Sequence, residues 1–378
     1  MILNEIGNEF DQCIKCGLCL ATCPVGKALF LEKYTPRGKV QLAKRYAVGD
    51  LEISKQYRDI FARCLLCGAC TVTCPSGVDQ KKVFLAMREE IVKKQGLHPK
   101  VEAAVKSLLA NHNISDEDNA ERGDWRDDIR DLPGHMYEKE RADVVYFVGC
   151  VASFFPMVQS IPRNMVWILE SAGVDFTILA SEEWCCGFPL IGAGAPGEMK
   201  TLMDHNLEKV KALGAKEVVF SCPSCYRTWK EHYPTELKLS HSAQFIERLI
   251  KEGPISLGEV LETVTYHDPC DLGRNAGVFD APREVLRSIP GLTFVELASN
   301  RNQSICCGGG GNLEMADAAL SGRVARNKIE EVRQTGAGTV VTACQQCVRS
   351  IKGKVRREKL DLDVVDITDI VVRSMSHG

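Results

Sequence analysis

The C-terminal two thirds of the chain alternate short apolar runs with stretches in which apolar residues recur every three or four positions. The short runs, rich in β-branched and aromatic residues, predict strands, and the periodic stretches predict helices. The strands are expected at 144–148, 176–179, 218–220, 264–266, 294–297 and 339–342, and the helices at 157–172, 199–212, 281–288 and 315–333. This alternation predicts parallel sheets with helices outside them.

The first third of the chain has a different pattern. Apolar side chains between residues 24 and 63 recur at helical spacing, and further helices are predicted at 80–94, ahead of Gly96, and at 98–111. From residue 116 to 131, acids and arginines dominate without apolar periodicity. We interpret this segment as a solvated connection pinned by Trp125, with a partner-docking segment as the alternative.

Length and composition limit what the cysteines can do. With 378 residues the chain can form two or three domains with real cores, so its 18 cysteines are not needed as disulfide staples. The acidic N-terminal residues do not form a secretory signal, and no apolar run is long enough to span a membrane. We therefore expect a cytoplasmic protein, where clustered cysteines bind metal. The net charge of −3 argues against nucleic acid as the main partner.

Eight cysteines form two runs of identical spacing, each closed by a Cys-Pro pair. This Cys-x2-Cys-x2-Cys-x3-Cys-Pro spacing is typical of [4Fe–4S] ferredoxins, in which the fourth cysteine of each run binds the other cluster. By that rule one cubane cluster takes Cys13, Cys16, Cys19 and Cys74, and the other takes Cys64, Cys67, Cys70 and Cys23. A zinc site fits poorly, because tetrahedral zinc usually takes its ligands as two separated pairs.

The other ten cysteines form one set that occurs twice, with intervals that match to within one residue. The sets are Cys150, Cys185, Cys186, Cys222 and Cys225, and Cys270, Cys306, Cys307, Cys344 and Cys347. The repeat predicts two tandem domains. In each set two cysteines follow predicted strand ends, where parallel sheets gather their ligands, and one (Cys225, Cys347) lies on the first turn of the next helix.

Each set offers five thiols, although a cubane [4Fe–4S] centre needs four. One thiol is therefore spare, or it bridges irons in a non-cubane centre. Because both copies keep all five, we favour the bridging interpretation.

These motifs resemble known families. The long helical insert between the two ferredoxin runs resembles the helical ferredoxin domain of fumarate reductase and heterodisulfide reductase iron–sulfur subunits. The repeated Cys-Cys-Gly sets resemble the CCG family, which includes the D subunit of heterodisulfide reductase and the iron–sulfur subunits of glycolate and lactate oxidases. The resemblance implies one non-cubane [4Fe–4S] cluster per five-cysteine set, with a substrate disulfide cleaved between the two clusters.

One position departs from that resemblance. Relatives often have a histidine directly after the cysteine of His-Asp-Pro-Cys, whereas Asp271 follows Cys270 here. If that histidine handles a proton in relatives, its absence weakens the disulfide reductase interpretation. His267 remains a candidate catalytic proton donor; the alternative is a hydrogen-bonded histidine at a strand end.

Three further features have both a functional and a simpler interpretation. His205 and Asn206 occupy the same positions in the repeat as Arg326 and Asn327, and could donate to cluster sulfurs or merely lie on a helix surface. The glycine run 308–311 lacks the signatures of a nucleotide loop and is expected to approach a cluster with its backbone. The basic run 349–359 is expected to be a solvated helix face, with a docking surface for an acidic redox partner as the alternative.

We therefore predict an α+β multidomain protein. A helical two-cluster ferredoxin domain (1–111) and a linker (112–140) precede two tandem α/β CCG domains with parallel sheets (141–255 and 256–378). The expected function is electron transfer through two cubanes to two CCG-bound clusters, as in a heterodisulfide reductase; the alternative is a pure relay without substrate chemistry. We expect a flavin-containing redox subunit or electron-transfer flavoprotein as partner in a hetero-oligomeric complex, which could hold the chain at a membrane surface.

Overall fold

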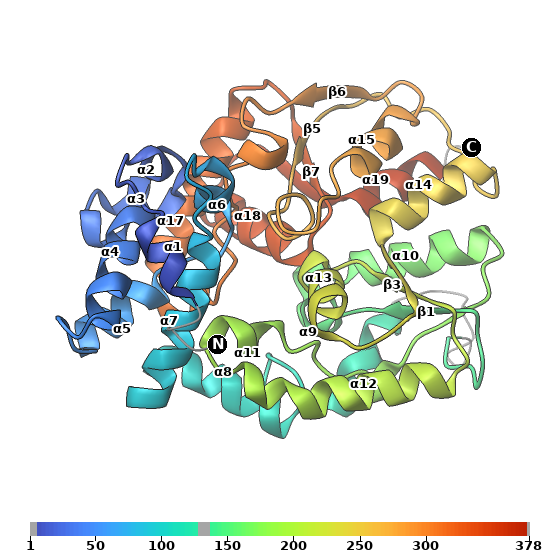
Figure 1. Ribbon diagram of the computed structural model, residues 1–378. Helices are drawn as coiled ribbons and strands as arrows, with labels where there is room; N and C mark the ends of the chain where they lie inside the picture. The colour runs from blue at the N-terminus through green and yellow to red at the C-terminus, as the bar shows by residue number, and fades with distance from the viewer. Residues whose placement is uncertain (1–5, 128–136, 376–378) are drawn as a thin grey trace.

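The computed structural model describes residues 6–127 and 137–375. Its N-terminal part is helical, with α1 (Gly7–Asp11), α2 (Leu18–Thr22), α3 (Pro24–Leu29), α4 (Pro36–Ala47), α5 (Lys55–Ala62), α6 (Ala69–Thr73), α7 (Gln80–Gln95) and α8 (Pro99–Ala110). The helices predicted at 80–94 and 98–111 are confirmed as α7 and α8. Figure 1 shows α1 to α7, in blue and cyan, gathered on one side of the molecule.

The cluster-binding loops of this helical part depend on two glycines. Gly17 and Gly68 precede α2 and α6 with φ of +85° and +73°, in the left-handed region that favours glycine. At Gly17 a side chain would also meet the guanidinium of Arg37. The tight Cys-x2-Cys-Gly turns therefore require glycine at this position.

The C-terminal part of the chain consists of two similar halves. The first half (residues 144–252) contains a parallel sheet in the order β2-β1-β3-β4. The strands are β1 (Val144–Phe147), β2 (Phe176–Thr177), β3 (Glu217–Phe220) and β4 (Lys238–His241). The helices are α9 (Cys150–Phe154), α10 (Ser160–Ser171), α11 (Phe188–Ala193), α12 (Lys200–Ala212), α13 (Pro223–His232) and α14 (Ser242–Glu252). The segment before it contains the 3-10 helix η3 (Asn119–Arg126).

The second half repeats this arrangement, with a parallel sheet in the order β6-β5-β7-β8. Its strands are β5 (Thr263–His267), β6 (Thr293–Glu296), β7 (Thr339–Thr342) and β8 (Asp363–Asp366), and its helices are α15 (Asp280–Arg287), α16 (Leu313–Ala316), α17 (Ala318–Arg333), α18 (Gln345–Glu358) and α19 (Ile367–Met375). The registers are equivalent, since Val145 pairs with Val218 in the first sheet and Thr265 with Val340 in the second. The predicted α+β fold with two parallel sheets is confirmed.

Two details differ from the sequence prediction. The fourth strand of each sheet, β4 and β8, is not among the expected strands, because one is polar and the other is a two-valine run between acids. The helix predicted at 315–333 is two helices, because Asp317 leaves the helical conformation (φ −154°) and caps α17 by accepting from the Leu320 N–H.

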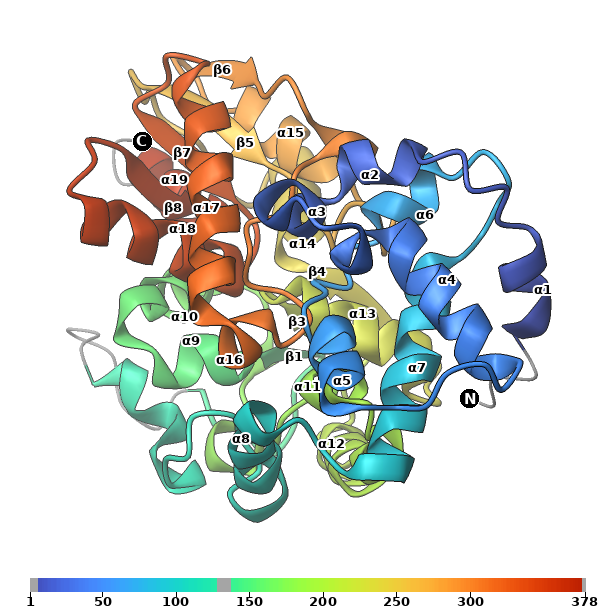
Figure 2. The same ribbon diagram turned by 90° about the vertical axis from the view of Figure 1, so that its left-hand side faces the viewer.

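The two halves pack on each other and against the helical part. α10 of the first half contacts α19 of the second, and α14 contacts α15, so one apolar core runs through both halves. Figure 2 shows α3 of the helical part beside α17 of the second half, and these helices are in contact. Among residues 6–127 and 137–375, no helix combines the length and apolarity needed to cross a bilayer.

Candidate iron–sulfur centres

The eight cysteines of the helical part form two separate groups. Cys13, Cys16, Cys19 and Cys74 line one small cavity, and Cys23, Cys64, Cys67 and Cys70 line another. Each group therefore combines three cysteines of one run with the fourth cysteine of the other, which is the crossed grouping that the motif predicts. Burial raises the pKa of the Cys19 and Cys23 thiols to about 11. A bound metal would remove that proton, because coordinating thiols are deprotonated outright.

The first five-cysteine set gathers at the carboxyl edge of the first sheet. Cys150 begins α9, Cys222 directly precedes α13 at the end of the β3 segment, and Cys225 lies on the first turn of α13, as predicted. All five thiols are buried, and hydrogen-bond contacts join neighbouring thiols of the set. Hydrogen bonds from Cys185 and Cys225 lower the pKa of Cys186 to about 6. A buried set of converging thiols, in which Cys186 and Cys222 both have a lowered pKa, suits a metal cluster.

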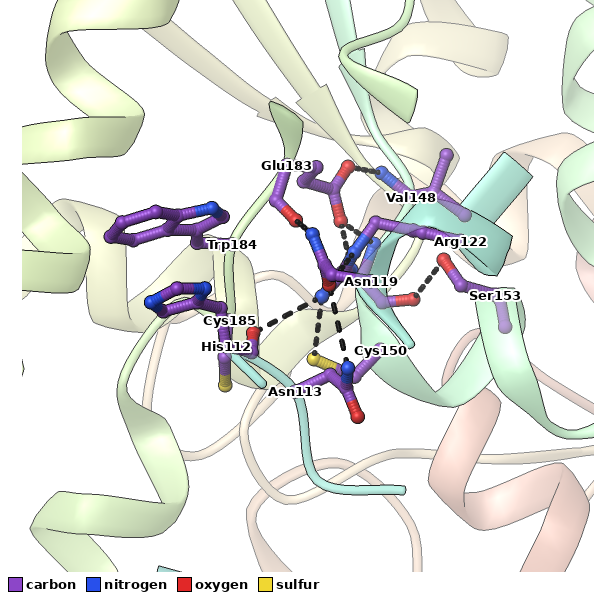
Figure 3. A network of polar contacts seen from close by, with 12 residues as sticks. His112, Asn113, Asn119, Arg122, Val148, Cys150, Ser153, Glu183, Trp184 and Cys185 are labelled. Atoms are coloured by element: carbon purple, nitrogen blue, oxygen red, sulfur yellow. Dashed lines mark hydrogen bonds and ion pairs between the residues drawn. The ribbon is translucent and has the colours of Figure 1, made fainter. Parts of the chain in front are cut away.

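A buried ion pair supports the first set (Figure 3). Arg122 donates to Glu183 Oε1 at 2.8 Å and to Cys150 Sγ at 3.4 Å. The Glu183 carboxylate also accepts the backbone N–H groups of Val148 and Gly149 at 2.7 and 2.8 Å, in the turn that leads to Cys150. Burial opposes the charge of Arg122, but Cys150 and Glu183 outweigh it and raise the pKa of the guanidinium. Arg122 thus remains a cation beside the Cys150 thiol.

Arg122 lies in the segment that the sequence predicts to be a solvated connection. The acids of that segment, such as Asp116 and Asp124, are exposed, and Trp125 is buried, as expected. Arg122 is nevertheless only 1% exposed. Within residues 116–127 the prediction therefore holds for the acidic side chains and fails for Arg122, because the ion pair with Glu183 carries it into the first half. The rest of the predicted segment, 128–131, lies outside the described residues.

The second set has the same placement in the second sheet. Cys344 caps α18, and Cys347 lies on its first turn. Hydrogen bonds from Cys306, Cys347 and His267 lower the pKa of Cys307 well below its usual range. Four of the five thiols are buried, and Cys270 is half-buried. The equivalent cysteines of the two sets, Cys186 and Cys307, are thus both held toward the thiolate form.

His267 lies behind this second set. Its ring is fully buried, and one ring nitrogen lies within 4.8 Å of the Cys307 and Cys347 Sγ atoms. Apart from this contact with Cys307, neither ring nitrogen has a hydrogen-bond partner within the described chain. His267 therefore ends β5 with a hydrogen-bond contact to one thiol, an arrangement compatible with both the proton-donor interpretation and the simpler alternative. Burial lowers the pKa of His267, so the ring is neutral at ordinary pH and faces the thiols.

Asp271, the residue that departs from the family pattern, joins the two halves. Its carboxylate accepts from Arg227 at 2.6 Å, Ser224 Oγ at 2.7 Å and Asn275 at 2.8 Å. Burial alone would raise the pKa of Asp271, but Arg227 and Lys81 lower it below the usual range. The Asp271 carboxylate is therefore ionised and has no proton to donate. It links α13, which carries Cys225, to the segment that carries Cys270.

Gln345 makes a second link between the halves, in the opposite direction. From α18 it donates to Val148 O at 2.6 Å and accepts from Ala152 N at 3.1 Å, so it braces the turn that carries Cys150.

Between the two sets lies a cavity of about 470 Å³, lined by all five cysteines of the first set and by four of the second, the exception being Cys306. The structure thus brings both sets to one space.

Cys306 instead contacts the helical part. Its thiol is within hydrogen-bond reach of Cys67, which belongs to the second ferredoxin-type group. Arg274 secures this contact by donating to Cys67 O at 2.9 Å and to Ser304 O. The glycine run adds to it, because a Cβ on Gly310 would lie 2.8 Å from Leu65 O. The run thus lies against the backbone of the loop that carries Cys64 and Cys67, while its approach to a cluster stays a prediction.

Arg88 holds all three parts together at this junction. From α7 it donates to Cys64 O at 2.7 Å, Gly192 O at 2.5 Å and Gly311 O at 2.9 Å. It is buried, so these carbonyls replace its hydration. The placement of the helical part on the two halves is therefore specified by polar contacts as well as by apolar packing.

The remaining sequence candidates lie away from the thiols. Asn206 holds the backbone of Trp184 and Cys185, while His205 Nε2 donates to Glu182 O at 2.8 Å and its ring stacks on Trp184. Arg326 pairs with Glu358, and Asn327 is exposed. The simpler interpretation is right for Arg326 and Asn327, whereas Asn206 positions the chain ahead of the adjacent cysteines.

Local patterns do not single out Arg122, Arg274 or Gln345, because each acts across a long chain separation. Local patterns do not single out Lys328 either. It is buried in α17, and the Cys306 and Cys307 thiols interact with its charge. A signal for it does exist, since Lys328 occupies the repeat position of the apolar Leu207.

Two family models match the chain. The 4Fe-4S dicluster domain matches residues 9–78, and the cysteine-rich CCG domain matches residues 144–230 and again 264–352. These matches cover the crossed cysteine groups and both halves. Together with the converging thiols, they show an iron–sulfur protein, and the chemistry of the donor sets fits that cofactor.

Curated relatives match nearly the whole chain. The D subunit of the dihydromethanophenazine:CoB–CoM heterodisulfide reductase of Methanosarcina mazei is 33% identical over 97% of this chain and 94% of that protein. The EtfAB:quinone oxidoreductase of Syntrophomonas wolfei is 26% identical over 97% of this chain and 58% of that protein. A solved hypothetical protein from Helicobacter pylori shares the fold, with a TM-score of 0.60 at 11% identity over 92% of this chain and 69% of that one.

A dicluster domain followed by two cysteine-rich domains defines an iron–sulfur electron-transfer protein. The identity along almost the full length is more specific. The chain belongs to the family of the D subunit of heterodisulfide reductase.

Proposed function

We propose that the chain carries four [4Fe–4S] centres and uses the two C-terminal ones to reduce a disulfide or a similar two-electron acceptor. The two cubanes are assigned to the crossed groups, Cys13, Cys16, Cys19 and Cys74, and Cys64, Cys67, Cys70 and Cys23. The two non-cubane centres are assigned to the five-cysteine sets, Cys150, Cys185, Cys186, Cys222 and Cys225, and Cys270, Cys306, Cys307, Cys344 and Cys347.

The single observation that carries this proposal is the cavity between the two sets. Cysteines of both sets line it, so a bound molecule would lie between both centres. When bound, the clusters supply one-electron transfer. Reduction of a disulfide takes two electrons, and two one-electron centres on opposite walls suit that reaction. The clusters themselves would fill part of this cavity, because the cysteines that line it are their proposed ligands.

The surface around Cys16 supports electron entry at the N-terminal end. Cys16 is exposed, and the apolar side chains of Ile14 and Leu18 beside it are 67% and 52% exposed. Exposed apolar residues around a redox site suit contact with another protein. We propose a flavin-containing redox subunit or electron-transfer flavoprotein as that partner, within a hetero-oligomeric complex.

His267 fits this function as a group that acts on a thiolate. It contacts Cys307 and is not among the residues that line the cavity. As a neutral ring it would donate a hydrogen bond to the Cys307 thiolate without transferring a proton, and a ligand in the cavity would receive its protons by another route. Asp271 is ionised and paired, so it does not replace the histidine that relatives have at this position.

A second candidate function is a pure electron relay. It is favoured by the similarity to a protein named EtfAB:quinone oxidoreductase, which spans 97% of this chain. In that case the C-terminal centres would connect a flavoprotein to another carrier and would bind no substrate.

Metal analysis and turnover together test the proposal. Anaerobically purified protein should contain about sixteen irons and as many sulfides per chain, from four [4Fe–4S] centres. It should also oxidise a reduced viologen dye when hydroxyethyl disulfide is added. About eight irons together with bound zinc would contradict the four-centre assignment. A full iron content without disulfide turnover would favour the relay.

A further inference from the structure

The cavity between the two five-cysteine sets has apolar walls from three parts of the chain. Ile114 comes from the connecting segment, Val151, Phe155 and Phe188 from the first half, and Met315 and Ala318 from the second half. Pockets lined in this way bind the apolar body of a ligand and use a few polar groups for orientation.

Among the described residues that line this cavity, three are charged, and each already has a partner of opposite charge. Asp271 is paired with Arg227 at 2.6 Å. Arg349 is paired with Glu314 through two contacts, at 2.6 and 3.2 Å, and Gln346 donates to the same carboxylate at 3.0 Å. The Arg349 guanidinium also lies 4.5 Å from the centre of the Phe155 ring. No charge on this wall is left for a charged ligand.

An anionic ligand would compete with Glu314 for Arg349 here. Binding through Arg349 would separate that guanidinium from Glu314, which leaves a carboxylate without its cation in a partly desolvated site. An uncharged ligand leaves the pair intact.

We propose that the cavity binds an uncharged disulfide with an apolar body, and that Glu314 sets this preference by neutralising Arg349. The inference rests on the proposed disulfide reduction and names its substrate class. In the reaction the S–S bond of R–S–S–R′ breaks, two electrons arrive from a one-electron donor protein or a viologen dye through the chain's iron–sulfur centres, and two protons from solvent give RSH and R′SH.

The proposal predicts a substrate ranking that a single substitution changes. With reduced viologen as donor, hydroxyethyl disulfide is compared with the dianionic disulfide dithiodipropionate. The wild-type protein should show a kcat/KM at least about tenfold higher for the neutral disulfide, because the anion must break a charge-assisted pair. Glu314→Gln frees Arg349, so it should raise kcat/KM for dithiodipropionate relative to hydroxyethyl disulfide by about tenfold.

Glu358→Gln is the matched control. Glu358 lies on the same helix as Arg349, pairs with Arg326 and Lys354, and does not line the cavity, so its substitution should leave the ranking unchanged. Both variants should keep the wild-type iron content and paramagnetic spectrum, which shows that the fold and centres are intact. A wild-type preference for the dianion, or an unchanged ranking in an intact Glu314→Gln protein, would overturn the proposal.

Binding measured in parallel separates this proposal from the proposed function. Calorimetric titration of the oxidised protein with the same two disulfides reports the preference of the cavity without turnover. A protein that binds the neutral disulfide more tightly but never reduces it contradicts disulfide reduction and supports the cavity preference. A protein that reduces both disulfides but favours the dianion supports disulfide reduction and contradicts the preference.

Discussion

The two halves of the C-terminal part share one scaffold and surround their cysteines differently. Strand order, register and cysteine placement are equivalent in both. At the strand end before the first cysteine, however, Phe147 in the first half corresponds to His267 in the second. On the helix after the adjacent pair, Leu207 corresponds to Lys328. The second set therefore has a ring nitrogen in contact with Cys307 and a buried lysine, paired with Glu331, whose charge interacts with Cys306 and Cys307, where the first set has apolar side chains.

The first half obtains its cation from outside its own repeat. Arg122 reaches Cys150 from the connecting segment, and it is held by Glu183, whose position in the second half is taken by Ser304. The second half instead contacts the helical part through Cys306 and Arg274. The repeated scaffold thus fixes where the thiols lie, and the residues that differ between the halves give each set its own electrostatics. We infer that the second set is the one next to the electron entry side.

The largest expected effect is on the centres themselves. Cys307→Ser and Cys186→Ser should each abolish the paramagnetic signal of their own centre and leave both cubanes, because removing a bridging thiolate opens the iron to water. Disulfide turnover should be lost in both. The comparison adds an asymmetry: Cys307→Ser should also stop reduction of the first centre by the cubanes, whereas Cys186→Ser should leave the second centre reducible. Intact clusters in both variants would show that the fifth cysteine is not a ligand.

A smaller effect is expected for the cation of the first half. Arg122→Gln removes a charged donor from Cys150, and a charge-assisted hydrogen bond contributes about 1.5–3 kcal/mol. The one-electron potential of the first centre should fall by up to roughly 60–130 mV. Redox titration followed by paramagnetic resonance measures this shift. Arg126→Gln is the control, since Arg126 lies in the same segment and pairs with Glu138. A shift of both centres, or an equal shift in the control, would contradict a local role.

The smallest effect is expected for the histidine of the second half. His267→Phe places the first-half residue at the equivalent position and removes a neutral donor from Cys307. Neutral hydrogen bonds contribute about 1 kcal/mol, so the potential of the second centre should fall by about 40 mV while the first is unchanged. The same titration tests this, and Thr265→Val, a substitution on the same strand without thiol contact, serves as its control. An unchanged potential would leave His267 with a packing role only.

Much of this molecule could be predicted from local patterns. Cysteine spacing predicted the crossed groups in the helical part and the two five-cysteine sets, because cluster motifs are short and their ligands have characteristic intervals. Alternating strand and helix patterns predicted both parallel sheets, including the β7 strand at its observed bounds. The fourth strand of each sheet, β4 or β8, was not predicted, because short strands with polar or acidic ends carry little periodic signal.

What only the tertiary structure decided is how distant segments meet at the cysteines. The sequence placed Arg122 in a solvated connection. In the structure the Glu183 carboxylate is buried against the backbone that follows β1, and a buried carboxylate requires a cation, which Arg122 supplies. Cys306 could not be told from its four companions by spacing, and only the packing of the helical part brings it to Cys67. Likewise, Glu314 and Arg349 are two ordinary charged residues in the sequence. The fold makes them neighbours on one wall of a cavity, because contacts between remote segments depend on how whole sheets and helices pack, which no local pattern records.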